Sequence, residues 1–267
     1  MEYPIVNLSI RGVPAFNDNY LWLLDDGERA VVVDPGDAAP VQAALAQREL
    51  SLCAILITHH HFDHTGGVDA LLAVAPVPVF GPDDARIPQV THPLKAGDRC
   101  EFLGLEAEII EVPGHTSEHI AYFVRDPAAC GAPLLFCGDT LFAGGCGRLF
   151  EGSPAQMRNS LQKLADLPDD TRVYCAHEYT QANLKFAKAV EPNNAALAAR
   201  IESVAQARDA GQPTVPSTLA EELATNPFMR WQQQEVIASA ASQRGSNARE
   251  LAADEVFATI RQWKDNF

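Results

Sequence analysis

The sequence lacks a long hydrophobic run, a low-complexity tract and an internal repeat. Its most apolar stretch, LLAVAPVPVF at residues 71–80, is broken by two prolines and is too short to cross a membrane. The start, MEYPIVNLSI, has no basic segment followed by an apolar core, as a secretion signal would have. We therefore expect neither secretion nor membrane insertion.

Cysteine pairs are also missing, because none of the six cysteines forms a CxxC motif or a spacing typical of a disulfide framework. They are Cys53, Cys100, Cys130, Cys137, Cys146 and Cys175. This pattern predicts reduced thiols in a cytoplasmic protein.

Basic residues are scarce: 20 Lys and Arg stand against 35 Asp and Glu, for a net charge of −15. Such a surface repels a polyanion, which argues against general binding of nucleic acid. The imbalance is uneven, since residues 1–177 carry −13 and residues 178–267 carry only −2. An anionic ligand would meet less repulsion in the C-terminal segment.

The chain has 267 residues, of which 47% are hydrophobic. Its first 177 residues alternate between strand-like and helix-like stretches. Short apolar runs with the composition of buried strands recur, each ended by Gly, Pro or polar residues. They are AVVVDPGD, AILITHHH, AEIIEVPGH, LLFCGDT and RVYCAHE. Helix-like stretches lie between some of them: PVQAALAQREL, HTGGVDALLAV and SPAQMRNSLQKLADL. This part is predicted to be a layered α/β structure.

After residue 178 the strand signals vanish and helical spacing takes over. The helical stretches are TQANLKFAKAV, NNAALAARIESVAQARDA and TLAEELAT, interrupted at Pro192, at GQPTVPS and at Pro227. We predict two domains, a layered α/β domain over 1–177 and a smaller helical domain over 178–267.

Four of the eight histidines are concentrated in one stretch, THHHFDH at residues 58–64. In an extended segment alternate side chains point the same way, so His59 and His61 can bind one ion while His60 faces elsewhere. Asp63 and His64, beyond a turn, are placed to serve a neighbouring ion. We expect a supporting or structural role for His60.

Three later strand-like runs end in His115, Asp139 and His177. Strand ends that meet at one edge of a sheet bring such side chains together, and Zn²⁺ commonly takes three or four protein ligands. If Asp139 bridges, one ion is held by His59, His61 and His115 and the other by Asp63, His64 and His177. Considered alone, a single His at the end of a strand is more often a hydrogen-bonded structural residue than a metal ligand. His92 is expected at the surface, and His119 in packing or support rather than ligation.

These residues resemble the metallo-β-lactamase superfamily, whose hallmark is HxHxDH followed by His, Asp and His. Within it the chain is similar to the hydroxyacylglutathione hydrolases, also called glyoxalase II. The matching stretches are FNDNY, VDPGDA, THHHFDHTGG, VPGHTSEHI, FCGDTLFAGGCGRLFEG, CAHEYTQANLKFA, NPFMR and RQWKDNF. The resemblance implies an αββα sandwich followed by a helical domain, and the same seven metal ligands.

The implied activity is thioester hydrolysis of S-(2-hydroxyacyl)glutathione, typically S-D-lactoylglutathione, to glutathione and D-lactate, the second step of methylglyoxal detoxification. The implied cofactors are two divalent ions, principally Zn with Fe or Mn as alternatives, which would lower the pKa of a bridging water from about 15.7 towards 7. Asp63 and Asp139 would orient the resulting hydroxide. The resemblance also assigns glutathione binding to Arg148, Tyr179, Arg261 and Lys264, and the protein is expected to act as a cytoplasmic monomer.

Two positions depart from the family pattern: Phe150 stands where some members carry Tyr, and Phe62 where many carry Trp. Phe150 has no hydroxyl to donate to glutathione. Alternative functions stay open at this point: a persulfide dioxygenase with a single iron, a β-lactamase, a lactonase, or a non-catalytic protein that binds glutathione conjugates. The RxxK pattern of the C-terminal tail favours the glutathione thioesterase over the lactamase and lactonase.

Overall fold

The computed structural model describes residues 8–126, 131–245 and 251–267. Its residues group into two compact units: unit 1 takes Met1–Glu111 and Glu118–Gly138, and unit 2 takes Val112–Ser117 and Asp139–Phe267. The predicted boundary between residues 177 and 178 divides the chain elsewhere, and it stays a prediction. None of the helices in the described ranges is long and apolar enough to cross a membrane.

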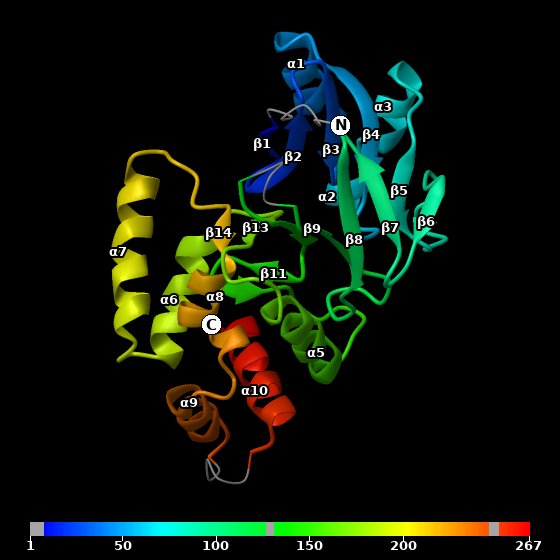
Figure 1. Ribbon diagram of the computed structural model, residues 1–267. Helices are drawn as coiled ribbons and strands as arrows, with labels where there is room; N and C mark the ends of the chain where they lie inside the picture. Colours follow the sequence, from blue (N-terminus) through cyan, green and yellow to red (C-terminus); the bar gives the residue numbers. More distant parts are fainter. Residues whose placement is uncertain (1–7, 127–130, 246–250) are drawn as a thin grey trace. The chain divides into compact units, whose positions relative to one another are not determined.

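Unit 1 contains a six-stranded mixed sheet in the order β1-β2-β3-β4-β5-β6 (Figure 1). The strands are β1 (Ser9–Ala15), β2 (Asn19–Asp25), β3 (Arg29–Val33), β4 (Ser51–Leu56), β5 (Val79–Pro82) and β6 (His92–Leu94). Neighbours from β1 to β3 run antiparallel, and those from β3 to β6 run parallel.

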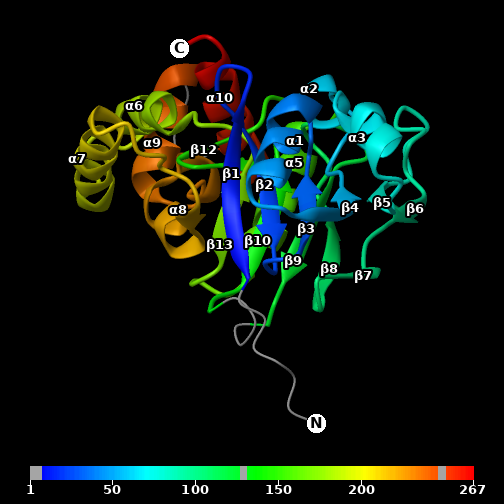
Figure 2. The same cartoon turned by 90° about the horizontal axis from the view of Figure 1, so that it is seen from above.

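Two helices cover one face of this sheet, as Figure 2 shows. Helix α1 (Ala38–Gln47) connects β3 to β4 and begins at Asp37, whose side chain accepts the backbone N–H of Ala39 at 3.0 Å. Helix α3 (Val68–Val74) follows the short helix α2 (Phe62–Thr65). The core here takes alternate strand residues, because successive side chains point to opposite faces of a strand. Among its members are Leu21, Leu23, Ala30, Val32, Ile55, Ile57, Val41 and Leu71.

The opposite face of the sheet is covered by four antiparallel strands of the same unit, in the order β10-β9-β8-β7. These are β7 (Arg99–Phe102), β8 (Leu105–Glu111), β9 (Ile120–Val124) and β10 (Leu134–Gly138). Every residue of β9 and β10 is buried. The hydroxyl of Tyr122 in β9 donates to the carbonyl of Ile57 at 2.9 Å, which links the two sheets directly.

Unit 2 is mainly helical and has two short strand pairs, β11 with β12 and β13 with β14. Its strands are β11 (Leu141–Phe142), β12 (Gly145–Cys146), β13 (Arg172–Cys175) and β14 (Ser217–Thr218). Its helices are α5 (Pro154–Ala165), α6 (Thr180–Val190), α7 (Ala195–Asp209), α8 (Leu219–Thr225), α9 (Gln234–Arg244) and α10 (Ala253–Asp265), with a 3₁₀ turn at Pro227–Met229. Ser153 begins α5 with a capping box to Gln156.

The sequence predictions of secondary structure are confirmed with three differences. The five strand-like runs are β3, β4, β8, β10 and β13, and all six predicted helical stretches form helices. The expectation that no strand follows residue 178 was wrong, because β14 pairs with β13. Helices α9 and α10 were not singled out, and α3 begins only at Val68, after two glycines. Five cysteines are thiols, as predicted, and Cys130 lies outside the described residues.

A buried ion pair stabilises unit 2. Glu222 in α8 is inaccessible to solvent and accepts hydrogen bonds from Arg200 at 2.6 Å, Asn226 at 3.0 Å and the backbone of Gly144 at 2.8 Å. We expect Glu222→Gln to lower the free energy of unfolding by about 3 kcal/mol, because Arg200 would stay buried with its main counter-charge removed. Urea denaturation measures this, and the exposed Glu202→Gln should change stability by less than about 0.5 kcal/mol.

Candidate metal centre

The histidines that follow β4 in unit 1 have the spacing of a metal site. His59 is buried, and its Nε2 lies 3.1 Å from Nδ1 of His61. Two ligands that each lie about 2.0 to 2.1 Å from one tetrahedral ion are about 3.3 Å apart, so these nitrogens have the separation that a shared ion requires. The alternation of side chains predicted for this segment therefore brings His59 and His61 together.

Asp34, just after β3, contacts two residues of this segment, Thr58 and His64. Its Oδ1 accepts the backbone N–H of Thr58 at 2.7 Å, and its Oδ2 accepts the Thr58 hydroxyl at 2.7 Å. The same Oδ2 lies 3.0 Å from Nδ1 of His64. A carboxylate this close to one ring nitrogen favours protonation of that nitrogen, which leaves the other, Nε2, for a metal. Asp34 has a φ of 51°, a left-handed conformation that Asp and Asn tolerate better than most residues.

Asp63 lies in the first turn of α2, where the chain turns back after His61. Its Oδ2 accepts a hydrogen bond from Asn19 Nδ2 at 3.0 Å and lies 3.5 Å from Nε2 of His64. The turn needs a glycine at residue 36, because a Cβ there would lie 1.8 Å from the carbonyl oxygen of Asp63. Asp63 Oδ2 and His64 Nε2 are thus close enough to share one ion, and that they do so stays a prediction.

In unit 2 the remaining three candidates lie together. Oδ2 of Asp139 is 3.4 Å from Nε2 of His115, and Oδ1 of Asp139 is 3.4 Å from Nε2 of His177. All three residues are buried. Because each carboxylate oxygen faces a different imidazole, Asp139 has the geometry of a bridge between two ions.

His115 is oriented by the chain that follows β12. Its Nδ1 lies 2.8 Å from the backbone carbonyl of Arg148, which makes Nδ1 the protonated nitrogen and leaves Nε2 for a metal. A glycine is required at position 147, since a Cβ there would lie 2.0 Å from the carbonyl oxygen of Asp139 and 3.1 Å from Nδ1 of His115. Gly147, in the FAGGCGR stretch, therefore leaves the space that the candidate ligands Asp139 and His115 occupy.

The other three histidines have the supporting or surface positions that the sequence predicted. His60 is partly buried, with Nδ1 3.5 Å from Asp84. His92 is exposed at the start of β6. His119 is buried and stacks on His59, with ring centroids 4.5 Å apart and planes 15° from parallel. His119 therefore packs against a candidate ligand.

The side chains of the described residues that could hold metal ions are His59, His61, Asp63 and His64 in unit 1 and His115, Asp139 and His177 in unit 2. Imidazole nitrogens and carboxylate oxygens suit divalent Zn, Fe and Mn, and thiolates are not needed. The tautomers set by Asp34 and by the Arg148 carbonyl further fit these residues to metal binding.

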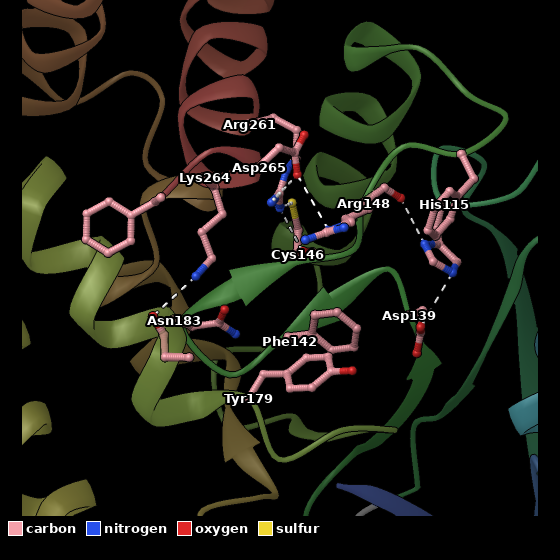
Figure 3. A pocket seen from close by; sticks show the side chains of 13 residues that line it. His115, Asp139, Phe142, Cys146, Arg148, Tyr179, Asn183, Arg261, Lys264 and Asp265 are labelled. Carbon is pink, nitrogen blue, oxygen red and sulfur yellow. Dashed lines mark hydrogen bonds and ion pairs between the residues drawn. The ribbon is translucent and has the colours of Figure 1, made fainter. Parts of the chain in front are cut away.

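A pocket of about 550 Å³ in unit 2 adjoins His115 and Asp139. Figure 3 shows His115 and Asp139 at the right, Lys264 at the left, and Arg148 between them, next to His115. The pocket is lined by His115, Asp139, Phe142, Cys146, Arg148, Phe150, Tyr179, Ala182, Asn183, Arg261, Lys264, Asp265 and Phe267. All four residues predicted to bind substrate therefore line one pocket.

The charges of this pocket favour an anionic ligand. Burial and the nearby guanidinium groups of Arg261 and Arg148 lower the pKa of Lys264. A bound carboxylate would relieve that repulsion.

Burial raises the pKa of the Cys146 thiol to about 11, so this cysteine is not a nucleophile at neutral pH.

Two aromatic residues connect the pocket to the candidate ligands. Tyr179, at the start of α6, stacks on His177 with ring centroids 4.7 Å apart and planes 6° from parallel. Phe150 is exposed and meets His115 edge-on at 5.2 Å. The Phe150 ring therefore contributes an apolar wall to the pocket.

Sequence reasoning missed the supporting residues Asp34 and Asn19 and the pocket residue Asp265. Asp34, Asn19 and Asp265 lie in VDPGDA, FNDNY and RQWKDNF, which were singled out as matching stretches without a role for these three positions. An Asp between a β-branched strand-like run and a Pro-Gly pair was the available sequence signal for Asp34.

We expect Asp34→Asn to weaken metal binding by about 10 to 100-fold, because it removes the charge that faces Nδ1 of His64. Asn tolerates the left-handed backbone, so the effect will be on metal affinity more than on folding. Competition with a chromogenic chelator measures the affinity. Asp69→Asn, at an exposed position of α3, is the control. Equal affinities of both variants and the unaltered protein would show that Asp34 does not support the site.

Two family models match consecutive parts of this chain. The family model described as metallo-beta-lactamase superfamily matches residues 16–177, and the one described as hydroxyacylglutathione hydrolase C-terminus matches residues 178–267. The hydroxyacylglutathione hydrolase of Cupriavidus taiwanensis is 53% identical, covering 97% of this chain and 99% of that protein.

Solved structures show the same fold at lower identity. The crystal structure of ETHE1 from Myxococcus xanthus has a TM-score of 0.63 at 22% identity, covering 96% of this chain and 98% of that one. The structure of TTHA1623 in a di-iron-bound form has a TM-score of 0.51 at 31% identity and covers 63% of this chain and 91% of that one.

The fold and the His and Asp groups therefore define a metal-binding protein with the metallo-β-lactamase fold. The α/β fold with a helical C-terminal region, predicted from the sequence, is confirmed. The match to both models and the identity to relatives over nearly the full length identify it further: the chain belongs to the hydroxyacylglutathione hydrolase family.

Proposed function

We propose that this chain is a glyoxalase II. It hydrolyses the thioester of S-(2-hydroxyacyl)glutathione, typically S-D-lactoylglutathione, to glutathione and a 2-hydroxy acid such as D-lactate, the second step of methylglyoxal detoxification. The pocket of unit 2 supports this proposal, because the cationic side chains of Arg148, Arg261 and Lys264 line it together with the candidate ligands His115 and Asp139. Relatives named hydroxyacylglutathione hydrolase at 53% identity support it.

We propose that two divalent ions, principally Zn with Fe or Mn as alternatives, are held by the seven His and Asp residues. The pairing of each Asp139 oxygen with a different histidine supports two ions rather than one. When bound, the ions would lower the pKa of water and so supply a nucleophile at neutral pH. A relative with a solved structure is described in a di-iron-bound form.

The chain's own residues orient the reactants. Asp63 and Asp139 accept hydrogen bonds from the attacking water and so aim its lone pair at the thioester carbonyl. Asn19 holds the Asp63 carboxylate in place through its 3.0 Å hydrogen bond. The leaving thiolate needs no dedicated proton donor, because thiols have a pKa near 8.5.

The substrate binds at the side of the pocket that cationic side chains line. Arg148 and Lys264 supply positive charge for the carboxylates of glutathione, and Tyr179 supplies a hydroxyl and an aromatic face. Phe150 and Phe142 leave an apolar wall near the reactive end. We further propose that the protein is cytoplasmic and acts as a monomer on this small molecule.

The proposal is tested by thiol release from S-D-lactoylglutathione, followed with a chromogenic disulfide reagent on protein loaded with Zn, Fe or Mn. We expect fast release that is abolished by chelation and restored by metal. Oxygen uptake with glutathione persulfide and cleavage of a β-lactam are run in parallel. Release no faster than the chelated protein, or oxygen consumption in its place, would refute the thioesterase function.

A further inference from the structure

A second pocket of unit 2 lies between helices α6 and α7, which are side by side in the fold (Figure 1). We call it the α6–α7 groove. Its volume is about 320 Å³, at the lower end of the roughly 300–1,000 Å³ that is usual for small-molecule sites. The apolar residues that form its floor are Leu184, Ile201, Val204 and Ala205. None of these four residues lines the pocket beside His115 and Asp139, so the groove is a separate candidate site.

The floor of the groove continues the apolar core between the two helices. Leu184 of α6 and Val204 of α7 belong to one buried cluster, and Ile201 packs against that cluster while it stays partly exposed. The contact of α6 with α7 therefore leaves apolar surface open to solvent at this place. A hydrocarbon chain that lies on the floor would remove this surface from water, which is favourable.

Two lysines of α6 line the groove as well. Lys185 and Lys188 are exposed, and their spacing of three residues puts them on the same side of the helix. Helix α6 has no acidic residue, although the whole chain has a net charge of −15. The groove therefore combines an apolar floor with positive charge on a protein that is otherwise acidic.

In the ranges that the structure describes, the ammonium groups of both lysines have uncharged partners. Lys188 donates to the backbone carbonyl of Pro192 at 2.6 Å, which occupies one of its three N–H donors. Nζ of Lys185 lies 5.8 Å from the centroid of the Phe267 ring. Each lysine thus keeps N–H donors for an anion, and a carboxylate would accept charge-assisted hydrogen bonds from them.

We propose that the α6–α7 groove binds a small amphipathic carboxylate, a molecule with a short hydrocarbon chain and one acidic group. The hydrocarbon chain lies on the apolar floor, and the carboxylate accepts hydrogen bonds from Lys185 and Lys188. A helical peptide fits less well, because the floor spans about one turn of α7, from Ile201 to Ala205, whereas a docked amphipathic helix places its anchors over two turns. The site goes beyond the proposed thioesterase function and does not rest on it.

Isothermal titration calorimetry of the metal-loaded protein with octanoate tests the proposal. We expect one octanoate to bind per chain. Octyltrimethylammonium, which has the same hydrocarbon chain and the opposite charge, should bind at least about 10-fold more weakly. The double variant Lys185→Met with Lys188→Met should weaken octanoate binding about 10-fold, because both ion pairs are lost. Lys95→Met removes an exposed lysine of unit 1 and should leave the affinity unchanged.

Ala205→Leu tests the apolar floor separately from the charges. The larger side chain would occupy part of the groove, and we expect it to weaken octanoate binding at least about 10-fold. Ala199→Leu is the matched control, because it makes the same change at an exposed position of α7 outside the groove. It should bind octanoate as the unaltered protein does. If Ala205→Leu is not folded by circular dichroism, the double lysine variant and the cationic probe still decide.

Three results would overturn the proposal. The first is no binding of octanoate at millimolar concentrations, and the second is equal affinity in the double lysine variant and the unaltered protein. The third is loss of binding in Lys264→Met but not in the double lysine variant, which would place octanoate in the other pocket. Capture of a Glu-rich amphipathic helical peptide in place of octanoate would make the groove a protein-docking surface instead. Calorimetry needs no thiol release, so this proposal and the thioesterase function fail separately.

Discussion

Asp139→Asn is expected to slow thiol release from S-D-lactoylglutathione about 10³-fold and to reduce the metal content by at least one ion per chain. The amide keeps the shape of the side chain and removes its negative charge. It also replaces one of the two acceptor oxygens that face His115 and His177 with an NH₂ group, which cannot bind a metal ion. Elemental analysis of the purified protein and the steady-state assay measure both effects.

The control for this prediction is Asp170→Asn, which makes the same chemical change at an exposed turn. It should keep full activity and full metal content. The thermal stability of the Asp139 variant measured with chelator present separates loss of metal from loss of fold. An Asp139→Asn protein with wild-type metal content and kcat would remove Asp139 from the reaction.

Gly147→Ala is expected to lower kcat/KM about 100-fold. Its Cβ would lie 2.0 Å from the carbonyl oxygen of Asp139 and 3.1 Å from Nδ1 of His115, so the backbone must shift at two candidate ligands. Displacing a positioned group by about 1 Å is enough for an effect of this size. Steady-state kinetics at saturating metal measures the loss.

Gly104→Ala separates this clash from the general cost of replacing a glycine. Gly104 has a φ of 75° but no atom within 4 Å of its Cβ position, so the substitution adds backbone strain without a clash. We expect it to reduce stability slightly and to leave kcat/KM intact. If both variants lost activity equally, the close approach at residue 147 would not be important for catalysis.

The arrangement of the candidate ligands of unit 1 was predictable because a local rule determines it. Successive side chains of an extended segment alternate in direction, so His59 and His61 could be paired from spacing alone. The structure brings their nitrogens to 3.1 Å. His60, between them, turns to Asp84, a partner that no local rule could have identified.

The supporting residues were not predictable in the same way. Asp34 reaches Thr58 and His64 only because β3 and β4 are parallel neighbours in the sheet. Asn19 meets Asp63 across 44 positions of the chain. Such contacts depend on strand pairing and turn geometry. The sequence shows only that the segments VDPGDA and FNDNY match the family pattern, and it does not show which residues they contact.

The sequence by itself determined the fold class, the family resemblance and the seven candidate ligands, because strand periodicity and the HxHxDH spacing are properties of the chain alone. The tertiary structure decided what each supporting group does. It assigned Oδ1 and Oδ2 of Asp139 to different histidines, and it turned the guanidinium of Arg261 towards Cys146 and Asp265. These assignments depend on packing between segments far apart in sequence, where a side chain's partner is set by three-dimensional distance.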